Sequence, residues 1–351
     1  MTDRFVARAT LLQQKTFIAE KVLELHTNES PAFGSKLTDR YRYYYLQDTE
    51  YHIMYLAEAV ALEEPGIFKS YINWANTFFS SIAVDLRDCA DNLYFFQKVL
   101  EEFLPSGLSD EAAAMISDAR KLFESPPPVP DSYLIRSGKL RAEAEQYLSL
   151  LINGERRPAS DLILRLHFEG TSISEIYSEI FIPVQLETGI LWQTGKINVA
   201  QEHFITASTQ FIMSRLYPFM FSGNRGNNKI LVTCINGELH EMGPRIISDF
   251  FEMKGWDSHF LGANTPAAGI IDYLKKYSIN LLALSVTMPY NLSNAALLIR
   301  KIRENDTEKQ IKIIVGGYAF SKGDGLWEKI GADGHADNIE AALSLADSLS
   351  I

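Results

Sequence analysis

The sequence predicts two helical domains followed by an α/β domain with a parallel, doubly wound sheet. Between residues 229 and 315, short apolar runs rich in β-branched residues alternate with helical patterns, as parallel sheets require. Before that region, apolar residues recur at helical spacing instead. The chain has 351 residues, which is too long for one ordinary domain. We therefore expect an α/β fold joined to all-α domains.

Two breaks in the chain predict the domain boundaries. The segment Ser125–Asp131 contains three consecutive prolines and a fourth nearby, so it cannot continue a helix. The segment Ser222–Asn228 is polar and rich in turn-forming residues. We expect an N-terminal helical domain at 1–130, a four-helix-bundle cap at 131–225 and a Rossmann-like domain at 226–351.

The helices of the first two domains follow from apolar spacing. The segment 37–61 contains no Pro or Gly, and apolar residues such as Tyr51, Met54, Tyr55 and Ala59 recur in it at helical intervals. By the same criterion, the other expected helices lie at 67–85, 89–103, 137–152, 157–169, 172–190 and 198–217.

The third domain alternates strands and helices. We expect strands at 229–235, 279–285 and 311–315, and helices at 243–254, 266–277 and 291–304. In doubly wound sheets, ligands bind at the carboxyl ends of the strands. The loops that follow these strands are therefore the places to search for a functional site.

Composition and charge exclude several classes of protein. The formal net charge is −11, and the basic residues are interleaved with acids, so nucleic-acid binding is not expected. The two cysteines, Cys89 and Cys234, imply neither a disulfide framework nor a cysteine zinc site. No window approaches 18 apolar residues, and the first residues carry no apolar signal region. We expect a cytoplasmic protein without membrane contact.

The loop after the first expected strand carries a histidine. It runs from Asn236 to Gly243, and Glu238 lies two residues before His240. A metal-bound histidine usually donates its other ring N–H to a carboxylate or carbonyl, which fixes its tautomer. On this segment alone, the alternative is an ordinary surface histidine in a loop.

The residues downstream of the histidine fall at a defined spacing. The segment Glu238-x-His240-x-x-Gly243 is followed by 41 residues, then Ser285-x-Thr287, then 28 residues, then Gly316-Gly317. This pattern over residues 228–351 resembles the cobalamin-binding domains of methionine synthase and the mutases. The alternative is a Rossmann-like domain without cobalamin.

The resemblance implies a role for each element of the pattern. His240 would be the lower axial ligand of cobalt and would replace the benzimidazole base of the cofactor. Ser285, Gly316 and Gly317 would line the cleft that holds the displaced nucleotide tail, where small residues permit close approach. Two positions depart from the family: Glu238 stands where Asp is usual, and Thr287 stands where Leu is usual.

A second pattern lies in the expected cap. Trp192 is followed after nine residues by Glu202 and His203, which resembles the cap of light-sensing, adenosylcobalamin-dependent regulators of the CarH type. The resemblance implies that these three residues contact the adenosyl group. Gln193 departs from that family, which has a histidine there. The alternative is a core tryptophan followed by an ordinary helix.

The N-terminal domain contains a tyrosine-rich segment. Residues 42–59 and 67–74 are similar to the extra helical domain of photocobilins, sensors that hold biliverdin beside adenosylcobalamin. The bilin contacts expected from this resemblance are Arg42, Tyr45, Asp48 and His52. Cys89 could anchor the bilin, although a buried free cysteine is more frequent. The alternative is a solvated polar face on a helix.

These observations predict a photoreceptor and signalling protein, with no catalytic residues of its own. It would use adenosylcobalamin together with biliverdin, and light would break the cobalt–carbon bond. The signal would pass through a homo-oligomer (a dimer or tetramer) or an unknown output partner. The first alternative is a corrinoid carrier protein for methyl transfer, and another is the cobalamin module of a mutase. A bulky tryptophan over the methyl group would hinder a carrier, which favours the sensor.

Overall fold

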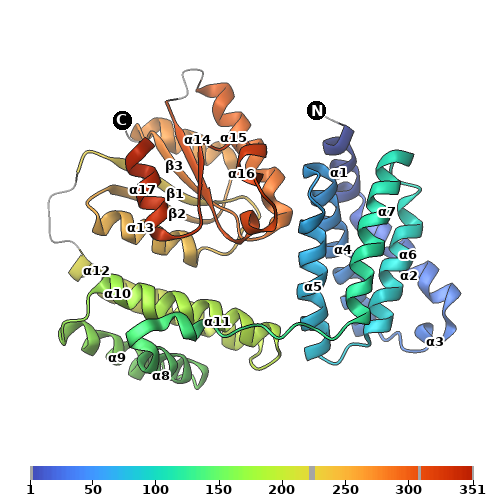
Figure 1. Ribbon diagram of the computed structural model, residues 1–351, viewed down its shortest axis with the longest axis horizontal. Coiled ribbons are helices and arrows are strands. Elements are labelled where there is room, and N and C mark those ends of the chain that lie inside the picture. The colour runs from blue at the N-terminus through green and yellow to red at the C-terminus, as the bar shows by residue number, and fades with distance from the viewer. Residues whose placement is uncertain (1–2, 221–225, 307–309, 350–351) are drawn as a thin grey trace. The chain divides into compact units, whose positions relative to one another are not determined.

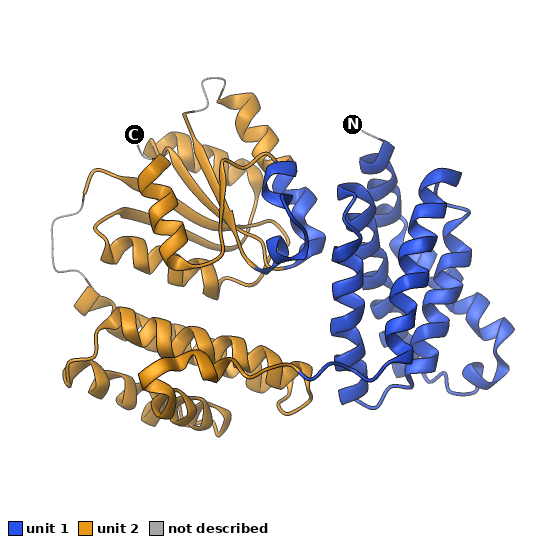
Figure 2. Ribbon diagram, viewed as in Figure 1, with its two compact units in different colours: residues 1–129, 288–296, 318–330 blue, residues 130–287, 297–317, 331–351 orange. Residues whose placement is uncertain are grey.

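The computed structural model describes residues 3–220, 226–306 and 310–349 (Figure 1). The chain divides into two compact units (Figure 2). Unit 1 comprises residues 1–129, 288–296 and 318–330, and unit 2 comprises residues 130–287, 297–317 and 331–351. The break expected at Ser222–Asn228 lies largely outside the described residues. The division into three domains stays a prediction.

Unit 1 is helical throughout its described residues. Its helices are α1 (Asp3–Gln13), α2 (Lys15–Glu29), α3 (Pro31–Gly34), α4 (Asp39–Leu62), α5 (Pro65–Ser81), α6 (Leu86–Leu100), α7 (Ser106–Arg120), the 3-10 helix η1 (Lys121–Glu124), and the short helices η4 (Pro289–Asn291), η5 (Tyr318–Lys322) and α16 (Leu326–Lys329). The helices expected at 37–61, 67–85 and 89–103 correspond to α4, α5 and α6.

Local signals set the ends of the long helices in unit 1. The Thr38 side chain accepts a hydrogen bond from the Tyr41 amide and caps α4, and Pro65 begins α5. The Asp85 side chain caps α6 in the same way, through the Arg87 amide. Helix α4 packs against α1, α2 and α5, and its C-terminal half is almost entirely buried. This helix is the centre of the core of unit 1.

Unit 2 begins with a helical cap. Its elements are the 3-10 segment η2 (Tyr133–Leu140), α8 (Arg141–Ile152), α9 (Arg156–Phe168), α10 (Ile173–Ile176), the π-helical turn η3 (Tyr177–Phe181), α11 (Ile182–Gln193) and α12 (Val199–Met220). The expected helix 172–190 is thus a helical run with a π turn inside it. The π turn η3 comes just before Pro183. Pro183 has no N–H to donate, so the regular hydrogen-bond pattern of an α-helix is interrupted here.

The sheet of unit 2 has five parallel strands. They are β1 (Lys229–Ile235), β2 (Asp257–Thr265), β3 (Leu281–Ser285), β4 (Lys312–Gly316) and β5 (Gly334–Ala336). Their order is β2-β1-β3-β4-β5, and each neighbouring pair is parallel. The helices of this part are α13 (Met242–Met253), α14 (Ala267–Tyr277), α15 (Leu292–Asn305) and α17 (Ile339–Leu349). The predicted Rossmann-like, flavodoxin-like fold class is confirmed.

The strand order places the switch point of the sheet between β1 and β3. Strand β1 pairs with β2 on one side and with β3 on the other. In such folds, the crevice at the carboxyl ends of these strands is where ligands bind. The loop with His240 leaves β1, and Thr287 follows β3, so both lie at this edge.

The cap shares a hydrophobic core with the sheet domain. Ile246 and Phe250 of α13 and Ile339 of α17 belong to the same cluster as the buried side chains of the cap. Within this junction the Tyr177 hydroxyl donates a hydrogen bond of 2.8 Å to Asp249. Burial raises the pKa of Asp249 to about 6, so this carboxyl is protonated more readily than an exposed one.

In the part of the chain that the structure describes, no helix is long and apolar enough to cross a membrane.

Candidate functional site

The loop after β1 is folded around the buried carboxylate of Glu238. This side chain is fully buried, whereas the side chain of His240 is 57% exposed. One carboxylate oxygen, Oε1, accepts from the His240 amide at 3.2 Å and lies 2.6 Å from His240 Nδ1. The other oxygen, Oε2, accepts from the Thr287 amide at 2.9 Å. Glu238 therefore joins the loop after β1 to the loop after β3.

This geometry fixes the tautomer of the histidine. Both oxygens of Glu238 accept hydrogen bonds from backbone amides, so Glu238 presents an acceptor to the ring and its partner Nδ1 carries the proton. The lone pair of the ring then lies on Nε2, which is the form that binds a metal. The extra methylene of Glu238, compared with the usual Asp, does not prevent this contact.

Two backbone contacts hold the loop against the end of β2. The Gly237 amide donates to Asn264 Oδ1 at 2.8 Å, and the Asn264 amide donates to the Glu238 carbonyl at 2.9 Å. Asn264 has a φ of +51°, a left-handed conformation that Asn tolerates better than most residues. Sequence reasoning missed Asn264, although the segment Asn264-Thr-Pro266 is a turn signal.

Glu241 links the same loop to the cap. Its Oε1 accepts from Gln210 Nε2 of α12 at 2.9 Å, and its Oε2 accepts from the Ala263 amide of β2 at 3.0 Å. One turn further along α12, the Ser214 hydroxyl accepts from Arg245 of α13 at 3.0 Å. Glu241 was not predicted as a site residue. In the sequence it could have been found from its position directly after His240, because residues next to a metal ligand often hold the ligand's loop in place.

Ser285, Gly316 and Gly317 lie together at the ends of neighbouring strands. Ser285 is in register with Cys234 of β1 on one side and with Gly316 of β4 on the other. Gly317 has a φ of +106°, and a Cβ placed on it would lie 2.4 Å from the Val286 carbonyl oxygen. The backbones approach so closely here that glycine is required at 317.

Gly243 shows the opposite situation. It lies in the first turn of α13, and a Cβ added there would meet no atom of the described chain within 4 Å. The space beside it is therefore not filled by the chain. Gly243, the last residue of the pattern that begins at Glu238, thus borders open space next to the histidine loop.

The cap residues Trp192, Glu202 and His203 occupy less specific surroundings. Trp192, at the end of α11, is partly buried and packs against the core of the cap. Glu202 and His203 are neighbours on α12 that bond to each other, and the His203 side chain is 74% exposed. Gln193 is buried. The alternative of a core-packed tryptophan thus accounts for Trp192 without a ligand.

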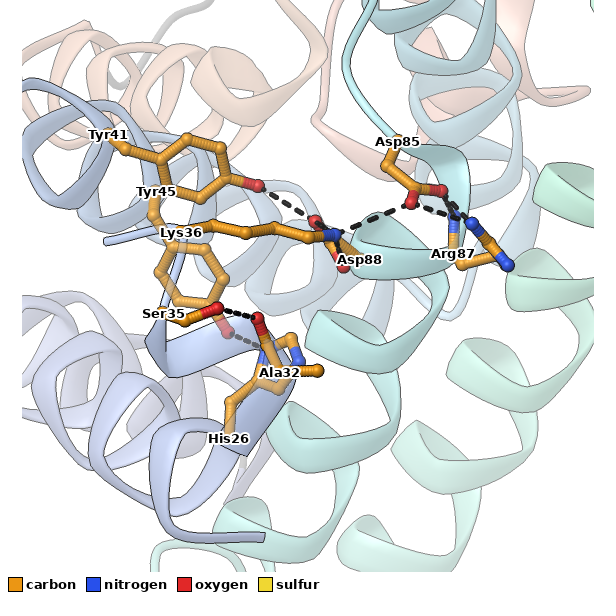
Figure 3. A network of polar contacts seen from close by, with 9 residues as sticks. All are labelled: His26, Ala32, Ser35, Lys36, Tyr41, Tyr45, Asp85, Arg87 and Asp88. Atoms are coloured by element: carbon orange, nitrogen blue, oxygen red, sulfur yellow. Dashed lines mark hydrogen bonds and ion pairs between the residues drawn. The ribbon is translucent and has the colours of Figure 1, made fainter. Parts of the chain in front are cut away.

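The residues expected to contact a bilin all lie on helix α4 of unit 1. Tyr45 and His52 are buried, with the Tyr45 hydroxyl hydrogen-bonded to His26 Nδ1 at 2.9 Å (Figure 3) and His52 Nδ1 bonded to the Tyr71 hydroxyl at 2.9 Å. Arg42 is exposed. Burial raises the pKa of Asp48 to about 7.

Unit 1 also contains Cys89, the residue considered as a bilin anchor, and a group of charged residues around Lys36. Cys89 is buried, and burial raises the pKa of its thiol well above the ordinary value, which makes it a poor nucleophile. Figure 3 also shows Lys36 between Asp85 and Asp88, with the Tyr41 hydroxyl donating to Asp88 at 3.2 Å. These side chains satisfy one another and tie α6 to the start of α4.

The residues of the histidine loop fit a corrinoid. Among residues 3–220, 226–306 and 310–349, no group of three or more His, Cys, Asp or Glu side chains could hold a metal ion. A single histidine whose Nδ1 faces a buried carboxylate suits a metal that brings its other ligands with it. The open space beside Gly243 and the close backbones at Gly317 are compatible with such a group and its tail.

Comparisons with known proteins agree with this class of site. Residues 228–344 match a family model described as a B12 binding domain, and residues 143–217 match a second model with the same description. The chain therefore carries a cobalamin-binding module made of a helical cap and a Rossmann-like domain, and the cobalamin prediction is confirmed at this level.

The individual proteins similar to this chain are corrinoid proteins. The chain is 23% identical over 179 residues to dimethylamine corrinoid protein 1 of Methanosarcina acetivorans. The aligned region covers 50% of this chain and 83% of the relative. It is 26% identical over 168 residues to dimethylamine corrinoid protein 1 of Methanosarcina mazei. That aligned region covers 47% of this chain and 76% of the relative. The monomethylamine corrinoid protein of Methanosarcina barkeri has a similar structure, with a TM-score of 0.51, 19% identity, and coverage of 58% of this chain and 96% of that chain.

These comparisons correct the predicted function. The expected resemblance to CarH-type regulators and photocobilins, and the light-sensing function inferred from it, are wrong, because the relatives are methylamine corrinoid proteins. Adenosylcobalamin and biliverdin as specific cofactors find no support in them. The physical reason is that Trp192 and Glu202 lie on two consecutive helices of the cap, α11 and α12, whose lengths set the interval between them. The spacing of Trp192 and Glu202 therefore did not discriminate between CarH-type regulators and methylamine corrinoid proteins.

Proposed function

We propose that this chain is a corrinoid carrier protein for methyl transfer, which works with partner methyltransferases and is not an enzyme by itself. The observation that carries the proposal is the prepared ligand His240, whose Nδ1 is held by the buried carboxylate of Glu238. The names of the similar corrinoid proteins support the methyl-transfer class. A cytoplasmic location is part of the proposal.

The residues of unit 2 would hold the cofactor in defined roles. His240 would bind the cobalt through Nε2, with Glu238 keeping its tautomer. Ser285, Thr287, Gly316 and Gly317, at the strand ends, and Gly243, beside the histidine loop, would accommodate the nucleotide tail. When bound, the corrinoid supplies a cobalt centre that accepts and gives up a methyl group.

The contribution of the chain itself is to orient the ligand and to shield it. The buried Glu238 removes the cost of choosing the metal-binding tautomer at the moment of binding. Gln210 and Glu241 connect helix α12 to the histidine loop. Near the start of α12, Glu202 and His203 are proposed as residues beside the cofactor, whereas Trp192 of α11 packs against the core of the cap.

The proposal is tested with the purified full chain and cobalamin. After reduction of the cobalt, the loaded protein is incubated with ¹⁴C-labelled methyl iodide, and separately with a methylamine methyltransferase and its labelled methylamine. Protein-bound label that approaches one equivalent per cobalt supports a carrier. A loaded protein that takes label from neither donor overturns the proposal. The variant His240→Ala, with unchanged secondary structure by circular dichroism, is the control for specific binding.

A further inference from the structure

Two loops of the α/β fold belong to unit 1. Residues 288–296 begin three residues after the end of β3, and residues 318–330 begin two residues after the end of β4, yet both segments cluster with the N-terminal helices (Figure 2). Thr287 and Gly317 are the residues that immediately precede them. The N-terminal helices therefore contact the chain segments that leave the strand ends described above.

The loop after β3 is anchored on a buried ion pair. Glu58 of α4 is 1% exposed, and it accepts from Arg8 Nε at 2.6 Å and from the Ser293 amide. Ser293 lies in the first turn of α15, where amides have no partner within the helix and a carboxylate is favourable. Arg8 also donates to Asn294 Oδ1 at 3.2 Å.

The buried pair imposes one geometry on this loop. Burial raises the pKa of Glu58, and the Arg8 guanidinium beside it opposes that shift. Leaving a buried charge without its partners is costly. The first turn of α15 is therefore held where its amide meets Glu58, and movement of this turn would leave both Glu58 and Arg8 incompletely paired.

The loop after β4 is anchored at the end of the same helix. Lys329 Nζ donates to the Leu62 carbonyl at 3.1 Å and lies 3.6 Å from Glu64 Oε2. A Cβ on Gly323 would lie 2.4 Å from Glu64 Cδ, and a Cβ on Gly66 would lie 2.6 Å from the Lys322 carbonyl oxygen. The approach at Gly66 is against backbone and only glycine allows it, whereas at Gly323 the neighbour is the flexible end of the Glu64 side chain.

An aromatic contact supports the first loop. The ring of Tyr290 lies edge-on to the ring of Tyr55, with centroids 5.2 Å apart, and Tyr55 stacks on Tyr71 at 3.9 Å. Such pairs add specific geometry to the buried apolar area. The loop after β3 is thus held by both polar and aromatic contacts.

We propose that the N-terminal helices act as a scaffold that positions the loops after β3 and β4, with Glu58 as the main positioning residue. The consequence concerns the cofactor, and in that respect it rests on the proposed function. Thr287, whose amide binds Glu238, is six residues before Ser293. Fixing the loop at Ser293 limits the motion of the segment that supports the carboxylate behind His240.

The test compares Glu58→Gln with Glu50→Gln. Glu50 lies on the same helix, where it pairs with Lys15 and accepts from the Thr16 hydroxyl at 2.6 Å. Each full-length variant is loaded with cobalamin, and dissociation is followed by absorbance. Hydrogen–deuterium exchange of peptides covering 286–296 and 318–330 is measured without cobalamin.

Glu58→Gln is expected to speed cobalamin dissociation by at least about fivefold and to raise exchange in the 286–296 peptide. Glu50→Gln is expected to leave both at the wild-type level, even where the two variants lose similar thermal stability. Equal dissociation rates and equal exchange for Glu58→Gln and the wild type would overturn the scaffold.

The two proposals fail in different ways. If the wild-type chain does not bind cobalamin, the proposed function fails, and the exchange experiment still decides whether Glu58 orders the loop. If Glu58→Gln does not fold, Lys329→Ala, at a partly exposed position, takes its place. It is expected to raise exchange in the 318–330 peptide, and unchanged exchange there would count against the scaffold.

Discussion

The substitution Glu238→Gln removes the charge behind His240 while keeping the shape of the side chain. The carboxylate accepts three hydrogen bonds, two from His240 and one from the Thr287 amide. A glutamine has one acceptor oxygen and one donor NH₂ group, so it cannot satisfy both sides. Either the NH₂ group faces the Thr287 amide, or it faces His240 Nδ1.

Both orientations weaken the ligand. In the first, a buried amide at Thr287 loses its acceptor, which costs about 1–3 kcal/mol. In the second, Nδ1 becomes the acceptor and the proton moves to Nε2, the atom proposed to bind cobalt. Replacing a residue that orients a metal ligand typically costs about 10–100-fold in affinity. We expect cobalamin affinity to fall within that range.

The assay is an equilibrium titration of the cobalamin-free chain, followed by absorbance. The tautomer is read independently, from ¹⁵N–¹H correlation spectra of the His240 ring in the cobalamin-free protein. The matched control is Glu340→Gln, at an exposed position of α17, which is expected to bind like the wild type. If Glu238→Gln binds within twofold of the wild type and keeps its proton on Nδ1, the argument from the tautomer is refuted.

Two further predictions concern stability. Gly317→Ala places a Cβ 2.4 Å from the Val286 carbonyl oxygen at a positive φ. We expect a loss of at least about 2 kcal/mol in urea unfolding, whereas Gly269→Ala, which meets no neighbouring atom, is expected to lose nothing. The second prediction concerns Asp249, whose pKa is raised from 3.8 to about 6. The protonated carboxyl therefore stabilises the folded state at low pH, and this stabilisation is lost as pH rises through the folded-state pKa. This amounts to about 1.4 kcal/mol between pH 5 and pH 8, and Asp249→Asn should remove that part of the pH dependence. Identical pH slopes for the variant and the wild type would contradict the assignment.

The sheet could be predicted where strands are apolar. Strand β1 was expected at 229–235 and is found there, because both of its faces are buried. Strand β2 was missed, because it lies at the edge of the sheet and most of its residues are only partly buried. Strand β5 has three residues, at the other edge, too few for a periodic pattern.

The histidine loop could be predicted because its chemistry is local. Glu238 and His240 are two residues apart, and the spacing to Ser285 and Gly316 follows the lengths of the intervening strands and helices. The contact of Glu58 with Ser293 joins residues 235 positions apart, and no pattern in the sequence indicates it. The cap shows the opposite error: the interval between Trp192 and Glu202 was taken for a light-sensing site, although it lies in a segment that matches a general B12 binding domain model.

The central claim is that His240 binds the cobalt of a corrinoid. Electron paramagnetic resonance of the chain loaded with cobalamin in its Co(II) form tests it directly. A coordinated ¹⁴N nucleus splits the cobalt lines into triplets, and ¹⁵N splits them into doublets. In protein labelled with [¹⁵N]histidine, the account predicts doublets that disappear in His240→Ala. Triplets that persist in the labelled protein, or doublets that remain in the variant, would contradict it.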